Sequence, residues 1–143
     1  MTRILLALDS SEKTMDEAVK AAREKNAFLT GLFVLDATWN EYIGHDWLSG
    51  SNARAGFLDY VKNEEQLESE RTIKAFEARA LAAGIPHETK VAPGRVPEEI
   101  CRELAAGYDL LIMSHPFRRG LEAVRDPLPK ILKGSSCSIL LVR

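Results

Sequence analysis

The residues best placed for chemistry follow a buried apolar run near the end of the chain. The run spans Leu110–Met113 and stops at Ser114-His115-Pro116, and a basic loop, Phe117-Arg118-Arg119-Gly120, comes next. An unbroken apolar run of this kind is typical of a parallel strand that is buried on both faces. Ligands of open α/β sheets bind at the carboxyl ends of such strands. We therefore predict that whatever this protein binds meets the crevice at this turn.

These residues predict neither a catalytic site nor a metal site. Ser114 has no evident base, because His115 is its direct neighbour and points to the other side of an extended chain. The chain has no nucleophile elbow and no Walker lysine loop. No metal-ligand spacing relates its three histidines, His45, His87 and His115. Arg118 and Arg119 either offer two cations to an anion near the crevice or form a solvated loop face. We expect a protein that is not an enzyme.

Length and composition predict a single domain over residues 1–143. With 45% apolar residues, a chain of 143 residues is long enough to bury roughly two thirds of its unfolded surface in one core. The net charge of -2 gives no general positive field, so nucleic acid and anionic membranes are poor partners. No apolar run approaches the roughly 20 residues of a membrane helix, and no signal-peptide pattern opens the chain. We expect a cytoplasmic protein in which Cys101 and Cys137 are reduced.

Strands and helices are expected to alternate along the chain. Apolar runs predict strands at Ile4–Leu8, Phe28–Leu35, His87–Val91, Leu110–Met113 and Ile139–Val142. Helical periods lie between them, and the longest helix is expected from Leu58 to about Ala83, with its acidic middle, residues 64–68, facing water. Strands that alternate with helices five times over imply an α/β fold with an open parallel sheet and helices on both faces.

Particular side chains indicate where the helices start and which faces they bury. Ser10 or Ser11 can cap the first helix by accepting from its free N–H groups. Pro97, followed by two acids, indicates another helix start, with an apolar face of Ile100, Cys101, Leu104 and Ala105. The long helix is expected to bury Leu58, Val61, Ile73, Phe76 and Ala80.

A long connection is expected over residues 37–56. It shows no sustained period and holds three large aromatic residues, Trp39, Tyr42 and Trp47. Long connections in compact domains are usually functional or mobile. These aromatic side chains either cover the crevice, form a surface for a partner, or pack on the domain's own helix.

Five segments of the chain together resemble the universal stress protein family. They are ILLALDSSEKTMDEAVKAA, GLFVLD, VAPGRVPEEI, YDLLIMSHPFRRGL and KILKGSSCSILLVR, and their order and spacing carry the resemblance over nearly all of the chain. The resemblance implies a five-stranded parallel sheet in the order 3-2-1-4-5, a Rossmann-like fold of the adenine nucleotide alpha hydrolase type. It also implies one of two groups, since some members of the family bind ATP and others do not.

The chain departs from the ATP-binding group where that group has glycines after the fourth strand. Those glycines let backbone N–H groups approach the phosphates. Here Ser114 and Phe117 stand in place of the first two glycines, and Arg125-Asp126 stand in place of the final Gly-Ser. Pro116 and Pro127 each remove a donor. The comparison places the chain in the group without the ATP motif, which implies that it acts in stress adaptation through protein partners and without a cofactor.

The residues that match the nucleoside-binding part of the family's site are better retained than those of the phosphate-binding part. Asp9 matches the aspartate that contacts the nucleoside, and Val34 and Met113 match positions that line the adenine. The positions that the resemblance implies for a nucleotide are Asp9, Val34, Met113, Ser114, His115, Arg118, Arg119 and Gly120, and AMP or adenosine is the ligand left open. Asp9 can instead cap the first helix beside Ser10, and Val34 and Met113 can simply be core residues.

The final strand is predicted to form a homodimer. Ile139, Leu140, Leu141 and Val142 carry no charge or proline that would discourage pairing with another strand. In the order 3-2-1-4-5 this strand lies at the edge of the sheet, and many universal stress proteins dimerise through it. The alternative is that a loop such as residues 37–56 covers this edge. Two other functions remain open: an adenine nucleotide or nucleoside sensor, and a regulatory partner of a transporter or enzyme.

Overall fold

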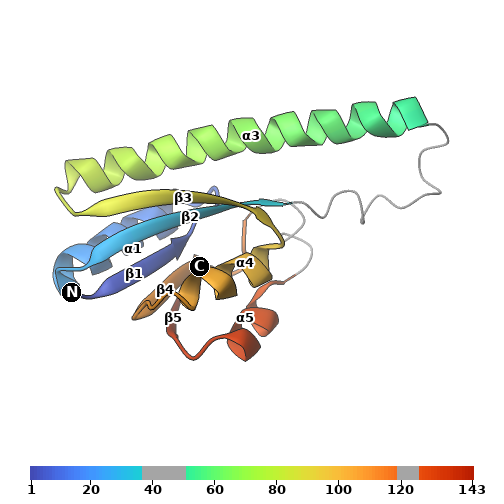
Figure 1. Ribbon diagram of the computed structural model, residues 1–143. Helices are drawn as coiled ribbons and strands as arrows, with labels where there is room; N and C mark the ends of the chain where they lie inside the picture. Colours follow the sequence, from blue (N-terminus) through green and yellow to red (C-terminus); the bar gives the residue numbers. More distant parts are fainter. Residues whose placement is uncertain (37–50, 119–125) are drawn as a thin grey trace.

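Five parallel strands form the centre of the molecule, and the helices of the described residues surround them (Figure 1). The computed structural model describes the backbone of residues 1–36, 51–118 and 126–143, and the side chains of these residues except 36 and 51–62. In chain order the elements are β1 (Arg3–Ala7), α1 (Glu12–Lys25), β2 (Phe28–Asp36), α3 (Ser51–Ala82), β3 (His87–Gly94), α4 (Val96–Leu104), β4 (Leu110–Ser114), α5 (Leu128–Gly134) and β5 (Ser138–Val142).

The strand order is β3-β2-β1-β4-β5, and every neighbouring pair is parallel. The predicted α/β class and the order 3-2-1-4-5 are therefore confirmed. β1 lies at the centre, where Leu5 pairs with Thr30 of β2 on one side and Leu111 of β4 on the other. The carboxyl ends of these three strands consequently meet at one edge of the sheet.

Alternate residues of the strands build two separate cores, one on each face of the sheet. Ile4 and Leu6 pack with residues of α1 and α3, whereas Leu5 and Ala7 pack with residues of α4 and α5. This alternation follows from the two-residue period of a strand. Because both faces are covered by helices, the strands read as continuous apolar runs in the sequence.

The first helix begins where its capping residue predicts. The Ser11 side chain accepts a hydrogen bond from the Thr14 backbone N–H at 3.2 Å, so Ser11 rather than Ser10 is the N-cap. At the other end, Asn26 has φ 52° in the left-handed region, and its N–H bonds to carbonyls of the last turn.

The long helix α3 is longer than predicted, because it begins at Ser51 and not near Leu58. The alanines and the arginine among residues 51–56 favour a helix even without an apolar period. Figure 1 shows the first half of α3 extending beyond the end of the sheet. The remaining part of the expected connection, with Trp39, Tyr42 and Trp47, lies outside the described residues.

The buried stripe of α3 also differs in part from the prediction. Phe76 and Ala80 are fully buried and Ile73 is partly buried, as expected, and the side chains of Leu58 and Val61 lie outside those described. The prediction that residues 64–68 face water is wrong for Glu65, which is only 7% exposed. Helical spacing places Glu65 on the same stripe as Phe76, and it is Leu67 that faces outward.

Two further boundaries differ from the prediction. β3 continues to Gly94 instead of ending at Val91, because it pairs with β2 along eight residues. Ala105, which was expected on the apolar face of this helix, is exposed, since α4 ends at Leu104.

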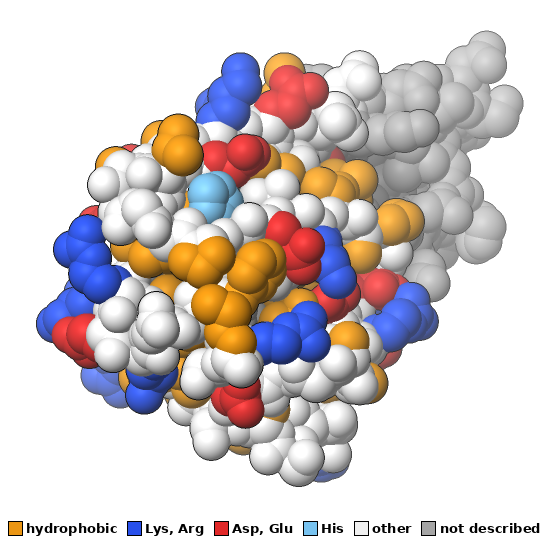
Figure 2. Space-filling model, turned by 60° about the vertical axis from the view of Figure 1, so that its left-hand side comes forward, with side chains coloured by type: hydrophobic (Ala, Val, Ile, Leu, Met, Phe, Trp, Pro, Cys, Tyr) orange, Lys and Arg blue, Asp and Glu red, His pale blue; other side chains and the backbone are white. Residues whose placement is uncertain are grey.

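Figure 2 shows one face of the molecule, where basic and acidic side chains are mixed around a central group of hydrophobic ones. Within the described part of the chain, no helix combines the length and apolar character needed to cross a membrane.

Candidate functional site

The predicted crevice lies at the carboxyl edge of the sheet, on the face covered by α4 and α5. Asp9 follows β1, Val34 lies near the end of β2, and Met113 lies near the end of β4. Val34 and Met113 belong to the core cluster of that face. The parallel pairing of the three strands thus brings these three positions to the same edge.

The carboxylate of Asp9 joins two turns of the chain. One oxygen, Oδ1, accepts the Ser11 backbone N–H at 3.0 Å, and the other, Oδ2, accepts the Arg118 backbone N–H at 2.9 Å. The Ser10 hydroxyl donates to the Arg118 carbonyl at 3.0 Å. Asp9 is only 2% exposed, so the loop after β4 is held against the turn after β1 by a buried charge. We call these three contacts the Asp9 clasp.

The ring of Phe117 belongs to the core on the crevice side of the sheet. Phe117 is 3% exposed and lies in the same buried cluster as Val34 and Met113. In the sequence comparison Phe117 stands in place of a glycine of the ATP-binding group. In the folded chain its ring is part of the buried cluster that holds the two residues matched to the adenine pocket, so the chain's own aromatic ring fills space on this side of the sheet.

Ser114 does not face the crevice. Its hydroxyl lies 2.7 Å from the Thr14 hydroxyl of α1, on the opposite face of the sheet. Thr14 in turn donates to the Ser11 hydroxyl at 2.9 Å, so the Thr14 oxygen accepts from Ser114. Because Ser114 is fully buried and its proton is used in this chain of hydroxyls, it has the environment of a structural residue rather than a nucleophile.

His115 links the end of β4 to the start of α5. Its backbone N–H donates to the Val142 carbonyl at 2.9 Å, and its Nε2 lies 3.3 Å from Oδ2 of Asp126. The other oxygen of Asp126 accepts the Leu128 backbone N–H at 3.0 Å. His115 and Asp126 are both part exposed, so their contact forms at the surface beside the crevice.

The structure therefore brings together only part of the predicted site. Asp9, Val34 and Met113 share the crevice edge, and Arg118 contributes its backbone while its side chain is exposed. Ser114 points away, and Arg119, Gly120 and Arg125 lie outside the described residues. Sequence reasoning missed Thr14, although its position three residues after the Ser11 cap is a recognisable signal. Among the described residues, no group of three His, Cys, Asp or Glu side chains could hold a metal ion.

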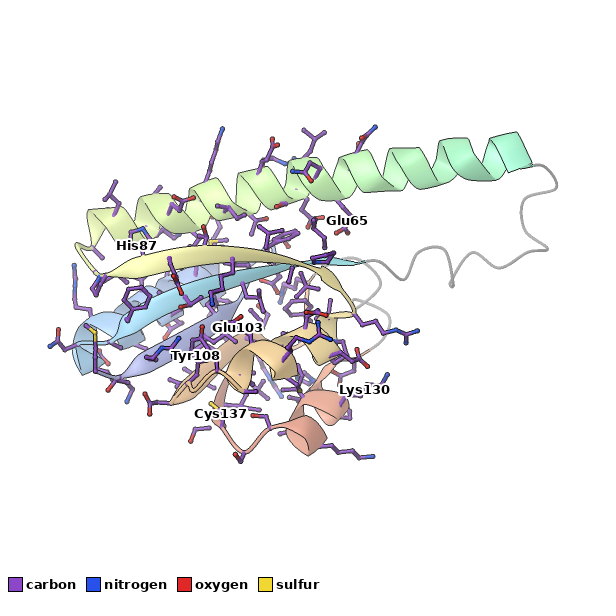
Figure 3. All side chains as sticks on the ribbon, in the orientation of Figure 1. Glu65, His87, Glu103, Tyr108, Lys130 and Cys137 are labelled. Atoms are coloured by element: carbon purple, nitrogen blue, oxygen red, sulfur yellow. The ribbon has the colours of Figure 1, made fainter. Side chains whose placement is uncertain are left out.

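A second polar cluster lies on the α4 side of the sheet, near the start of β4 (Figure 3). Glu103 accepts hydrogen bonds from Lys90 at 2.8 Å and from Tyr108 at 2.6 Å. Burial alone would raise the pKa of Glu103, but these two hydrogen bonds outweigh it and hold the pKa below its ordinary value. The hydrogen bond to Glu103 raises the pKa of Lys90, and burial raises the pKa of Tyr108. This cluster ties α4 to the sheet.

Both cysteines, Cys101 and Cys137, are free thiols in half-buried positions. Burial raises the pKa of Cys101 and of Cys137. The negative charge of Glu98 raises the pKa of Cys101 further, and that of Asp109 does the same for Cys137. Because the thiolate is the reactive form, thiols with a raised pKa are poor nucleophiles at neutral pH.

Several solved structures are similar to this chain and share its fold. Universal stress protein UspA from Lactobacillus plantarum is 20% identical, with a TM-score of 0.70 over 99% of this chain and 97% of that chain. The universal stress protein from Archaeoglobus fulgidus in complex with dAMP is 11% identical, with a TM-score of 0.64 over 100% and 98% of the two chains. A family protein from Arabidopsis thaliana with AMP bound is 16% identical, with a TM-score of 0.58 over 99% and 91%.

These structures show the fold of the chain, whereas its family is shown by sequence comparison. No curated protein sequence matches it. The model of the universal stress protein family, by contrast, matches residues 1–143. A match over the whole chain, together with the sheet order, shows that this protein belongs to the universal stress protein family.

Proposed function

We propose that this protein acts in the stress response, in the cytoplasm, by binding protein partners and without using ATP. The observation that carries the proposal is the Asp9 clasp, together with the buried ring of Phe117. A nucleotide bound at the positions that the family resemblance implies would need free backbone donors and open space. Here the Arg118 N–H is already bonded and the Phe117 ring fills part of that space.

Among the described residues, the physical obstacle to ATP is that backbone donors at the crevice are occupied or missing. A phosphate group is held by backbone N–H groups, and the N–H of Arg118 is already donated to Asp9. Pro116 has no N–H to offer. Asp126, whose carboxylate lies beside His115, adds a negative charge that repels a phosphate. ATP binding would therefore have to break the clasp and expose Phe117.

The proposed assembly is a two-fold dimer through β5. This strand lies at the edge of the sheet, and Leu140 and Leu141 are 41% and 40% exposed within a single chain. An uncovered apolar edge strand invites pairing, and two-fold symmetry is the commonest way to close it. Two domains joined in this manner would present a larger surface to a protein partner than one domain does.

Thermal unfolding with added ligand tests the proposal about ATP. Occupancy at 100 times the dissociation constant would add about 2.7 kcal/mol to the free energy of unfolding, which raises the Tm by several degrees. We expect no saturable shift with millimolar ATP. A saturable shift of that size would refute the proposal.

Sedimentation of the intact chain and of Leu141→Lys tests the dimer. The new charge opposes apolar contact at the edge but leaves the strand's hydrogen bonds available. Leu132→Lys is the matched control, because Leu132 is 58% exposed on α5 and not on the edge strand. We expect a dimer for the intact chain and the control and a monomer for Leu141→Lys, and a dimer in all three would count against pairing through β5.

AMP or adenosine binding is the second candidate function. It is favoured by the relatives that were solved with dAMP and AMP, and by the retention of Asp9, Val34 and Met113 at one edge. A nucleoside occupies less space in the crevice than ATP does, but it still requires space that the ring of Phe117 fills. A saturable Tm shift with AMP that disappears in Asp9→Ala would establish this function.

A further inference from the structure

A hollow lies between α1 and α3, on the face of the sheet opposite α4 and α5. Its volume is about 290 Å³, close to the lower end of the range for small-molecule sites. It is lined by Ser10 of the turn before α1, by Glu12 and Met15 of α1, and by Arg71, Thr72 and Ala75 of the middle of α3. The crevice residues Val34, Met113 and Phe117 belong to the opposite core cluster, so the hollow lies on the other face of the sheet and meets the Asp9 clasp at Ser10.

The inner stripe of α3 changes from apolar to polar as it reaches this hollow. Phe76 and Ala80 are fully buried over the sheet, whereas the next inward positions towards the start of α3 are Thr72, Ser69 and Glu65. These three residues are 6%, 3% and 7% exposed. Figure 3 shows Glu65 on the side of α3 that faces the sheet. A helix that only covers a core would carry apolar residues along this whole stripe.

Thr72 is the most informative residue of the stripe, because it lines the hollow itself. Its hydroxyl has no hydrogen-bond partner among the described residues, although Thr72 is only 6% exposed. A buried hydroxyl without a partner destabilises a fold, so such groups are rare unless water or a ligand satisfies them. The hollow therefore contains one preformed hydrogen-bonding group at its wall.

The rim of the hollow carries charges of both signs. Glu12 and Glu68 supply carboxylates, and Arg71 supplies a guanidinium group. Glu12 also contacts Arg79 at 3.4 Å, so its carboxylate is positioned near the start of α1. Met15, which is 3% exposed, and Ala75 supply an apolar wall between these charges. The rim therefore presents both acidic and basic groups beside an apolar wall.

We propose that this hollow binds a small zwitterion of the amino-acid class with a short apolar side chain. The ligand's ammonium group faces the carboxylate of Glu12, and its carboxylate faces the guanidinium group of Arg71. Thr72 donates or accepts one hydrogen bond, and the apolar side chain packs on Met15 and Ala75. The proposal does not depend on the function of the Asp9 crevice, and it survives if nucleotide binding there is disproved.

Isothermal titration of the intact chain tests the ligand class. The probes are L-leucine, 4-methylpentanoate, which lacks the ammonium group, 3-methylbutylamine, which lacks the carboxylate, and AMP. We expect saturable binding of L-leucine, affinities at least tenfold weaker for both single-charge analogues, and no competition from AMP. Absence of L-leucine binding, equal affinity for either analogue, or competition by AMP overturns the proposal.

Two variants locate the site. Arg71→Gln should weaken L-leucine binding at least tenfold, and Lys74→Gln is its control, because Lys74 is exposed on the same helix and does not line the hollow. Thr72→Val should also weaken binding at least tenfold, yet it should raise the Tm of the unliganded protein by about 3 °C, because it removes an unpartnered buried hydroxyl. A purely structural hydroxyl would give a lower Tm on removal. Unchanged affinity in either variant, or a lower Tm for Thr72→Val, refutes the assignment.

Discussion

Replacing Asp9 by asparagine should break the contact between the two turns at the crevice. In the native chain each carboxylate oxygen accepts one backbone N–H, from Ser11 at 3.0 Å and from Arg118 at 2.9 Å. An asparagine side chain has one oxygen and one NH₂ group of nearly the same shape. Whichever way the amide lies, one backbone N–H must face an N–H, and the negative charge is lost.

The cost follows from burial and charge. A hydrogen bond to a charged group contributes about 1.5–3 kcal/mol, and water cannot replace it because Asp9 is only 2% exposed. For a chain of 143 residues the entropy of unfolding is about 0.3 kcal/mol per kelvin. The Tm of Asp9→Asn should therefore fall by about 5–10 °C. Asp16→Asn is the control, because Asp16 pairs with Arg79 at 2.9 Å but its side chain is 66% exposed, so its loss should cost less than about 1 kcal/mol.

Two measurements check this prediction. Thermal and urea unfolding give the loss of stability, and amide hydrogen exchange reports on the Arg118 N–H itself. That N–H should be protected in the native chain and in Asp16→Asn, and it should exchange faster in Asp9→Asn. Equal Tm values for the two variants, or unchanged protection of Arg118 in Asp9→Asn, would show that the clasp does not hold the loop.

Three further changes test the packing and the electrostatics. Gly31→Ala places a Cβ atom 2.8 Å from Cε2 of the fully buried Phe76, so urea unfolding should show a loss of about 1–3 kcal/mol; a neutral result would mean that the ring moves freely. Phe117→Ala removes a ring that is 3% exposed and should cost about 3–5 kcal/mol in the same assay, whereas a loss below about 1 kcal/mol would place the ring in solvent. Glu103→Gln removes a carboxylate whose folded pKa is lowered, so the stability that it contributes is present at neutral pH and is lost as the pH falls through that pKa. The variant should be less stable at about pH 7 and should lose less stability between about pH 5 and pH 3, and equal acid slopes would contradict the assignment.

The sequence by itself determined the class of the fold, because the relevant signals are local. The apolar run Leu110–Met113 indicates a strand buried on both faces, and a serine before an amphipathic period indicates the start of α1. The order of such segments identified the family. The length of β3 and the burial of Glu65 were missed, since the first depends on pairing with β2 and the second on what α3 packs against.

Only the tertiary structure decided the state of the crevice. Asp9 and Phe117 could both be named from the sequence, and both were placed near the site. No local pattern shows, however, that the second oxygen of Asp9 accepts the N–H of a residue 109 positions further along the chain. That contact exists because β1 and β4 pair side by side, which brings the turns at their carboxyl ends together. The same pairing orients Ser114 towards Thr14 and away from the crevice, because successive residues of a strand face opposite sides of the sheet.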